Sequence, residues 1–386
     1  MKKIVFITRH DPTKIGGGAF ATRAYLEALN KIYPKQVVLF VADSYEDDEL
    51  SYKSSKIIKV LPRTKLKAVL GILIGKLTRF DKIIKSWIKD NKNNIDTVIF
   101  DGGLVGGSFI NIFKEYNCKL VTIHHNYEVE YHKENKSRET IKGIFFYWIK
   151  KFEKRAYLSS DINLFLTNPD LKSFKEKYGN SNSEQKVIGC FEFFKNEALA
   201  YETNNTISFN ANNAIKLIIS GSLVTSQTKD GVNWFLQTIY PKLKEKHKNI
   251  ELTITGRSPG EELIEKCKKL GVTIIPTPKD IRKIIAEGDI YICPTRLGGG
   301  LKLRIMDALA LGLPSIIQDK SFRGYENIGE SNFVTKFSDE VDFFSAFDEL
   351  LVNIKANSNN KDCIKNEYIK EFSFDAGVIR LKTFLK

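Results

Sequence analysis

The residues best suited to chemistry lie between Pro294 and Pro314, in the sequence PTRLGGGLKLRIMDALALGLP. This stretch follows the short apolar run 290–293, which is typical of a buried strand. Glycines at 298–300 let the backbone approach a ligand closely, and a helical pattern follows them. The free amides and positive dipole end of such a helix attract anions. The pattern therefore predicts an anion site at the carboxyl end of a strand, where open α/β sheets bind ligands.

Charged residues around this turn suggest what the anion is. Arg296 and Lys302 place two cations beside Gly299 and Gly300, and Asp307 follows about two turns into the helix. A carboxylate at that point can accept hydrogen bonds from ribose hydroxyls, so the set predicts a pocket for a nucleotide diphosphate. The alternative is a glycine-rich turn that only reverses the chain. The two cations and the Asp-Ala-Leu-Ala-x-Gly-x-Pro run favour the binding site.

The elements that position these residues follow from the hydrophobic pattern. Short β-branched, aliphatic or aromatic runs alternate with longer helical stretches, which predicts parallel sheets in an α/β fold. The polar, Asn-rich segment 201–213 reads as a linker between two halves, each opening with a strand and a glycine-containing turn. The expected strands are Lys3–Thr8, Gln36–Val41, Thr97–Phe100, Leu120–Ile123, Ile162–Leu166, Lys216–Ser220, Glu251–Thr255, Val272–Ile275, Ile290–Cys293 and Ser315–Ile317.

Composition excludes several classes of protein. The 386 residues are 42% hydrophobic and 27% charged, as in ordinary globular proteins, so a disordered or fibrous chain is excluded. No apolar run approaches the ~20 residues that span a bilayer, and the N-terminus reads as a strand and not as a signal peptide. Five scattered cysteines without a C-x-x-C pair argue against disulfides or zinc and for a reducing cytoplasm.

The net charge of +14 predicts an anionic partner. Residues 51–90 hold eleven lysines and arginines against two aspartates, and 141–157 mixes basic with aromatic residues. Both stretches suit an anionic membrane surface at the inner face of the plasma membrane. Ordinary amphipathic helices with solvated lysines explain them almost as well. The two basic stretches match no known nucleic-acid-binding motif, so no nucleic-acid partner is expected.

The 294–314 stretch resembles the donor-site motif of GT-B glycosyltransferases, especially family 4. Asp307 stands where that family has the Glu of Glu-Ala-Met-Ala, and Gly299 replaces a second usual Glu. The resemblance implies two Rossmann-like doubly wound domains facing a cleft. They would be an acceptor-binding domain at 1–205 and a nucleotide-sugar donor-binding domain at 206–360. A C-terminal helix in 361–386 can pack back on the first domain.

Other segments resemble the same family in order. The glycine loop after the first strand, the turn that opens the donor domain, its Asp-Gly segment and the next strand end each have a counterpart. On this basis the donor-binding residues are Gly17, Gly18, Gly221, Ser222, Lys229, Arg257, Arg296, Gly299, Gly300, Lys302 and Asp307.

In the first half, Ile123–Glu128 resembles the family's His-Asn-x-Glu strand end. The resemblance implies that His125 lies near the transferred sugar and that it and Glu128 are the catalytic candidates. His124 and Asp101 are the acceptor-binding candidates. Successive strand residues point to opposite faces, so only one of the two histidines is expected to reach the site. A structural histidine, a solvated Glu128 and a turn-capping Asp101 remain open alternatives.

The function implied is transfer of a sugar from a nucleotide-diphosphate sugar, UDP more than GDP, to a hydroxyl acceptor. The acceptor expected from the basic stretches is a polyprenyl-linked glycan in surface-polysaccharide synthesis, such as capsule. The family implies retention of anomeric configuration. No metal is expected, because the sequence has no Asp-x-Asp motif, and no cofactor beyond the co-substrate. A nucleotide-sugar epimerase of the same fold and a non-catalytic scaffold are the alternatives; Gly16–Gly18 does not fit the dehydrogenase spacing.

Overall fold

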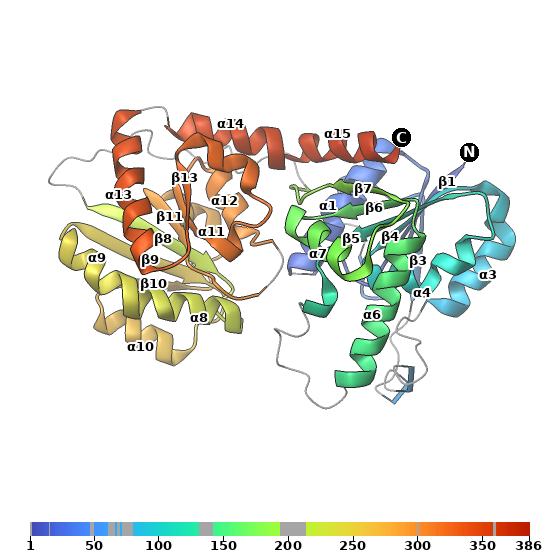
Figure 1. Cartoon of the computed structure of the whole chain (residues 1–386), viewed down its shortest axis with the longest axis horizontal. Coiled ribbons are helices and arrows are strands. Elements are labelled where there is room, and N and C mark those ends of the chain that lie inside the picture. Colours follow the sequence, from blue (N-terminus) through green and yellow to red (C-terminus); the bar gives the residue numbers. More distant parts are fainter. Residues whose placement is uncertain are drawn as a thin grey trace. The chain divides into compact units, whose positions relative to one another are not determined.

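The chain forms two compact units, seen in the computed structural model in Figure 1. The N-terminal unit comprises Met1–Lys195 with Phe374–Lys386, and the C-terminal unit comprises Asn196–Ser373. The structure describes residues 2–14, 16–46, 50–60, 66–67, 70–71, 80–130, 142–193, 214–298, 301–357 and 360–386. The expected linker 201–213 and much of the basic stretch 51–90 lie outside these ranges.

The N-terminal unit is built on a seven-stranded sheet of order β3-β2-β1-β4-β5-β6-β7, in which all pairings are parallel. The chain moves outward from β1 to one edge and then returns to β4 beside β1, so β1 and β4 flank a topological switch point. The strands are β1 (Lys3–Thr8), β2 (Val37–Ala42), β3 (Lys56–Val60), β4 (Ile95–Asp101), β5 (Lys119–His124), β6 (Ile162–Phe165) and β7 (Glu184–Val187). The principal helices are α1 (Gly17–Ile32), α3 (Asp81–Asn91), α4 (Gly103–Phe113), α6 (Lys142–Ser159), α7 (Asn168–Tyr178) and α15 (Phe374–Leu385).

Burial explains why these strands form. Every residue of β2 is buried, and so is almost all of β1, β4 and β5. Such continuous apolar runs are stable only when helices cover both faces of a parallel sheet. On one face, helix α4 lies so close to α6 that a Cβ on Gly107 would stand 2.0 Å from the carbonyl oxygen of Phe152. This close packing brings α6 beside the carboxyl end of β5.

Helix α15 belongs to the N-terminal unit although it ends the chain. It lies beside α1 (Figure 1), where Lys31 Nζ is 2.6 Å from Asp375 Oδ1. A Cβ on Gly377 would lie 2.1 Å from the ring of Phe191, so the helix packs closely on residues that follow β7. The preceding helix, α14 (Asn360–Phe372), belongs to the C-terminal unit.

The C-terminal unit has a six-stranded sheet of order β10-β9-β8-β11-β12-β13, again parallel throughout. Its switch point lies between β8 and β11. The strands are β8 (Ile215–Gly221), β9 (Ile250–Gly256), β10 (Thr273–Pro276), β11 (Ile290–Cys293), β12 (Ser315–Gln318) and β13 (Val334–Phe337). The α-helices besides α14 are α8 (Ser226–Trp234), α9 (Tyr240–Lys246), α10 (Glu261–Lys269), α11 (Ile281–Ala286), α12 (Arg304–Ala310) and α13 (Glu340–Ala356).

These sheets confirm the predicted α/β class with two doubly wound parallel sheets. All ten expected strands fall on observed ones. The sequence reading missed β3, β7 and β13, and each of these lies at the edge of its sheet. No helix within the described ranges is both long and apolar enough to cross a membrane.

Candidate functional site

The β8/β11 switch point of the C-terminal unit carries most of the residues predicted to bind the donor. Gly221 and Ser222 end β8 and begin the turn after it, and Arg296 follows β11 by three residues. Helix α8 packs closely here, since a Cβ on Gly231 would lie 2.5 Å from the carbonyl oxygen of Pro294. Because Gly231 has no side chain, α8 packs directly against the backbone that follows β11 and holds it in place.

Arg296 is paired with an acid that the sequence analysis did not single out. Its Nε donates to Asp230 Oδ2 at 2.7 Å and its Nη2 to Oδ1 at 3.1 Å. The guanidinium also lies over the ring of Trp234, 5.2 Å from the centroid. Hydrogen bonds to Asp230 raise the pKa of Arg296. The arginine is thus held in one orientation, with 40% of its side chain exposed and further N–H donors on its guanidinium.

The glycine turn differs from the expectation in one respect. Gly298 has φ +83, and a Cβ there would lie 2.2 Å from the side chain of Gln227. Gly299 and Gly300 lie outside the described residues. The helix expected after the glycines is α12, and it begins at Arg304 rather than directly after Gly300.

Backbone amides at the start of α12 donate hydrogen bonds to carbonyls of the turn that precedes it. The amide of Ile305 donates to the carbonyl of Lys302 at 3.0 Å, and that of Met306 donates to Leu303 at the same distance. These amides are therefore engaged within the turn. The Lys302 ammonium donates to the Gly298 carbonyl at 3.4 Å, while the Lys302 carbonyl accepts from Tyr325 at 2.9 Å. Arg296 and Lys302 are cations at this turn that do not depend on free amides of α12.

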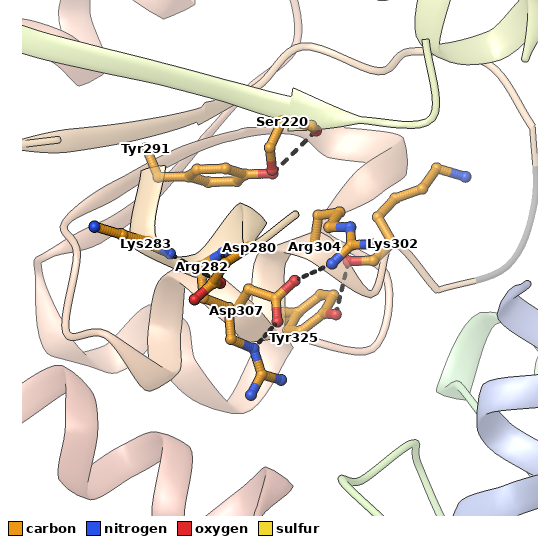
Figure 2. A network of polar contacts seen from close by, with 9 residues as sticks. All are labelled: Ser220, Asp280, Arg282, Lys283, Tyr291, Lys302, Arg304, Asp307 and Tyr325. Carbon is orange, nitrogen blue, oxygen red and sulfur yellow. Dashed lines mark hydrogen bonds and ion pairs between the residues drawn. The ribbon is translucent and has the colours of Figure 1, made fainter. Parts of the chain in front are cut away.

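Asp307 lies in a network of arginines, shown in Figure 2. Its Oδ1 accepts from Arg282 Nε at 2.8 Å and its Oδ2 from Arg304 Nη1 at 2.7 Å. Asp280 caps α11 by accepting from the amides of Arg282 and Lys283, which fixes the start of that helix. Asp307 is 5% exposed and links α11 to α12. Each of its oxygens has two lone pairs, so the two arginines do not exhaust its capacity to accept hydrogen bonds.

The remaining predicted donor-binding residues of this unit also lie at the carboxyl ends of the strands. Lys229 on α8 and Arg257 after β9 are exposed. The hydroxyl of Ser222 is buried, and among the described residues it has no hydrogen-bond partner. A Cβ on Gly221 would lie 3.0 Å from Thr228 Cγ2, so glycine allows α8 to start close to β8.

The N-terminal unit has a second polar cluster, at its β1/β4 switch point. Asp101 ends β4 and is completely buried. Its Oδ2 accepts from the hydroxyls of Thr8 and Thr22, both at 2.6 Å, and its Oδ1 lies 2.5 Å from His125 Nε2. Asp101 has no exposed surface, so the structure gives no support to its expected contact with an acceptor.

Asp101 and His125 set each other's charge. Burial by itself lowers the pKa of His125, but the negative charge of Asp101 and its hydrogen bond outweigh burial and raise that pKa. Burial likewise disfavours ionised Asp101, and the charge of His125 overcomes this and lowers the carboxyl pKa. Asp101 therefore favours the protonated form of His125, and His125 in turn favours ionised Asp101. His125 retains its other ring nitrogen for a ligand.

His124 points to the opposite side of β5. Its Nε2 lies 2.8 Å from Asn163 Oδ1, and its ring stacks on Phe165 with the centroids 4.9 Å apart. The residue is 1% exposed, and burial lowers its pKa to about 4. This is the environment of a neutral core histidine. It gives no support to the expected contact between His124 and an acceptor.

Glu128 forms an ion pair with Arg9 and lies next to the buried acid Glu153. Its Oε2 is 3.6 Å from Arg9 Nη2, and its amide donates to Glu153 Oε1 at 2.8 Å. Glu153 also accepts from the hydroxyl of Tyr178 at 2.8 Å, and burial raises its pKa to about 8. Glu153 on α6 thus holds the turn that contains Glu128, which is 6% exposed.

Comparison with known families shows what the C-terminal unit and the whole fold resemble. A family model described as "Glycosyl transferases group 1" matches residues 214–353, which include the entire β8/β11 cluster. Sucrose-phosphate synthase (tll1590) from Thermosynechococcus elongatus shares the fold, with a TM-score of 0.70 at 13% identity. That likeness covers 100% of this chain and 98% of the synthase. Residues 214–353 match the glycosyl transferases group 1 family, and the whole chain has the GT-B fold.

Two further similar proteins are informative. Anabaena Alr3699/HepE, solved in complex with UDP, has a TM-score of 0.67 at 11% identity, covering 99% of each chain. An uncharacterized 44.6 kDa protein in the cps region of Klebsiella pneumoniae is 25% identical over 236 residues. That match covers 58% of the glycosyltransferase and 56% of the relative, so it spans about half the length of the Klebsiella protein.

Several polar residues of the glycosyltransferase site escaped the sequence analysis. Asp230, which orients Arg296, stands beside the predicted Lys229, and its position before Gly231 was the available signal. Arg304 lies three residues before Asp307 on the same helix, and this spacing was the available signal. Arg282, which also holds Asp307, comes from α11 and carried no signal along the chain. Among the described residues, no three His, Cys, Asp or Glu side chains gather as ligands for a metal ion.

Proposed function

We propose that this glycosyltransferase moves a sugar from a UDP-sugar to a hydroxyl of a lipid-linked glycan, with retention of anomeric configuration. The observation that carries the donor assignment is the set of cations at one switch point, where Arg296 and Lys302 follow β11. Open α/β sheets bind ligands at this position. The UDP complex of HepE supports UDP as the nucleotide, and the cps-region relative supports a surface polysaccharide as the product.

In this proposal the C-terminal unit stabilises the leaving group. Departure of UDP builds negative charge on the β-phosphate. Arg296, held in place by Asp230 and Trp234, and Lys302 provide preorganised positive charge for it. Lys229 adds a third, exposed cation on α8. Asp307 would accept a ribose hydroxyl through its remaining lone pairs.

The N-terminal unit supplies the groups that act on the sugar. The protonated form of His125, favoured and oriented by Asp101, would donate a hydrogen bond to a sugar hydroxyl. Glu128, next to Arg9, would contact the acceptor or the sugar. His124 is left out of this role because its ring packs against Phe165 in the core.

Binding of nucleotides tests the donor assignment directly. We expect UDP to raise the melting temperature of the full-length protein more than GDP does. Titration calorimetry should show UDP binding weakened about tenfold or more in Arg296→Ala and in Lys302→Ala, since each loses a charge-assisted contact of about 1.5–3 kcal/mol. Lys246→Ala is the matched control, because Lys246 pairs with Asp348 on the surface of the same unit. Wild-type affinity in both site variants would contradict the assignment.

The lipid-linked acceptor is supported by one face of α6. Tyr147 and Leu158 are 58% and 43% exposed, and Lys150, Lys151 and Lys154 are exposed between them. Lys151 Nζ lies 5.6 Å from the centroid of the Tyr147 ring. Exposed aromatic and aliphatic groups among lysines suit the headgroup region of an anionic membrane.

We therefore place the enzyme at the inner face of the plasma membrane. Flotation with vesicles containing phosphatidylglycerol at low salt should carry the wild-type chain upward. Reversal of charge at Lys150, Lys151 and Lys154 should abolish flotation, whereas charge reversal at Lys242, Lys246 and Lys266, on the other unit, should not. Flotation of the α6 variant to the wild-type extent would remove this surface from the proposal.

A further inference from the structure

His10 lies at the β1/β4 switch point and has no role in the site described above. It follows β1, and its amide donates to the Thr8 hydroxyl at 3.0 Å, which itself donates to Asp101. The His10 ring meets the His125 ring edge to face, with the centroids 5.7 Å apart. Neither ring nitrogen of His10 has a hydrogen-bond partner among the described residues. The side chain is half-buried, so part of the ring remains open to a ligand.

Gly18 provides the space for this ring. A Cβ on residue 18 would lie 2.8 Å from His10 Cε1 and 3.2 Å from both ring nitrogens. A Cβ on the neighbouring Gly17 would meet nothing within 4 Å. The two glycines therefore differ, although both begin α1. Only residue 18 must lack a side chain for His10 to lie where it does.

We propose that His10 is a second sugar-contacting histidine, which Gly18 seats beside His125 and which hydrogen-bonds a hydroxyl of the same sugar. The inference rests on the proposed function, because it assumes that His125 faces the transferred sugar. It assigns Gly18 a role in shaping the sugar site, different from the contact with donor phosphate that the family resemblance implies.

The electrostatics of His10 fit this role. Burial lowers its pKa to about 4, and the charges of His125 and Arg9 act in the same direction, while Asp101 and Glu128 oppose them. At neutral pH the His10 ring is therefore uncharged, with one nitrogen that donates and one that accepts. His125, whose protonated form Asp101 favours, can only donate when it is protonated. A hydroxyl that donates to His10 would find there an acceptor that His125 does not offer.

A double-mutant cycle tests the pairing of His10 with Gly18. The assay is turnover of the best donor among UDP-glucose, UDP-galactose and UDP-N-acetylglucosamine by the full-length chain. We expect His10→Ala and Gly18→Ala each to lower kcat/KM about tenfold, and the double variant to be no worse than His10→Ala. With the ring gone, the methyl group that Gly18→Ala introduces has room. His10→Gln, which keeps an acceptor, should recover part of the loss, and His247→Ala on the other unit should match the wild type.

The outcomes separate the two proposals. An active wild type with unchanged kcat/KM in His10→Ala overturns the sugar contact and leaves the proposed function standing. Equal losses from Gly18→Ala with and without His10 overturn the seating role and favour contact with donor phosphate. A wild-type chain that neither binds nor turns over any nucleotide sugar refutes the proposed function itself.

The placement of the His10 ring by Gly18 can also be measured without a sugar-nucleotide donor. In long-range proton–nitrogen spectra, Gly18→Ala should shift the His10 ring signals because the new methyl group displaces the ring. Gly17→Ala is the matched control and should leave these signals in place, since its Cβ has open space. Unshifted His10 signals in Gly18→Ala would overturn the seating role whatever the enzyme transfers.

Discussion

Acidification should destabilise the N-terminal unit through His124, and the effect has a definite size. The histidine pKa is about 6.5 in the unfolded chain and about 4 in the folded one, where burial disfavours the charged ring. The unfolded state therefore binds more protons between these values, so stability falls as pH falls through this window. From pH 6.5 to 5 the window spans about 1.5 units, which at about 1.36 kcal/mol per unit amounts to about 2 kcal/mol.

The assay compares urea unfolding at pH 7.5 and pH 5.0, followed by tryptophan fluorescence. Trp87 and Trp148 both belong to the N-terminal unit, so the signal reports mainly on that unit. His124→Gln removes the titrating ring and retains a donor for Asn163. Its loss of stability on acidification should be smaller than that of the wild type by about 2 kcal/mol. His247→Gln, on the other unit, should lose as much as the wild type.

The test compares the loss of unfolding free energy between pH 7.5 and pH 5.0 in each variant, and not the absolute stabilities. His10 has a similarly lowered pKa and contributes a comparable loss in every variant that retains it. Replacing a packed ring also lowers stability at both pH values, and this cost cancels in the difference. If His124→Gln loses as much stability on acidification as the wild type, His124 is not the neutral core residue described here.

Three further outcomes follow from the structure. Asp101→Asn should lower the pKa of His125, visible in its ring nitrogen shifts, and reduce turnover at pH 7 at least tenfold, because the imidazolium loses its counter-charge. Gly256→Ala should destabilise the C-terminal unit by more than about 2 kcal/mol in urea, since φ is +154 and its Cβ would lie 1.8 Å from the Gly221 carbonyl oxygen. Glu153→Gln should gain stability relative to the wild type as pH rises from 5 to 8, by up to about 4 kcal/mol, because the pKa of Glu153 is raised to about 8 and the wild type must keep a proton that its unfolded form releases.

The interior strands were predictable because burial leaves a mark on the sequence. β1, β2 and β11 are continuous apolar runs, and their limits match the expected ones to within a residue. The missed strands β3 and β7 contain exposed charged residues such as Lys56 and Glu184. An edge strand pairs on one side only, so it needs less apolar surface, and charge on it discourages pairing with other chains.

The chemistry of the site was only partly predictable. Residue type and spacing marked Arg296, Lys302 and Asp307 as charged groups near a glycine turn. They did not show that Arg282 on α11 holds Asp307, or that Arg296 is fixed by Asp230. Hydrogen bonds between segments far apart in the sequence leave no periodic pattern, so they appear only once the chain has folded.

The sequence by itself determined the class of fold, the interior strands and the family resemblance, because these depend on local periodicity and on short motifs. The tertiary structure alone decided the surroundings and the protonation of the two adjacent histidines, His124 and His125. His124 and His125 are adjacent in sequence, yet one stacks on Phe165 with its pKa lowered, while the other meets Asp101 with its pKa raised. The physical reason is that the protonation of a buried group depends on the dielectric and charges around it, which residues from distant segments supply.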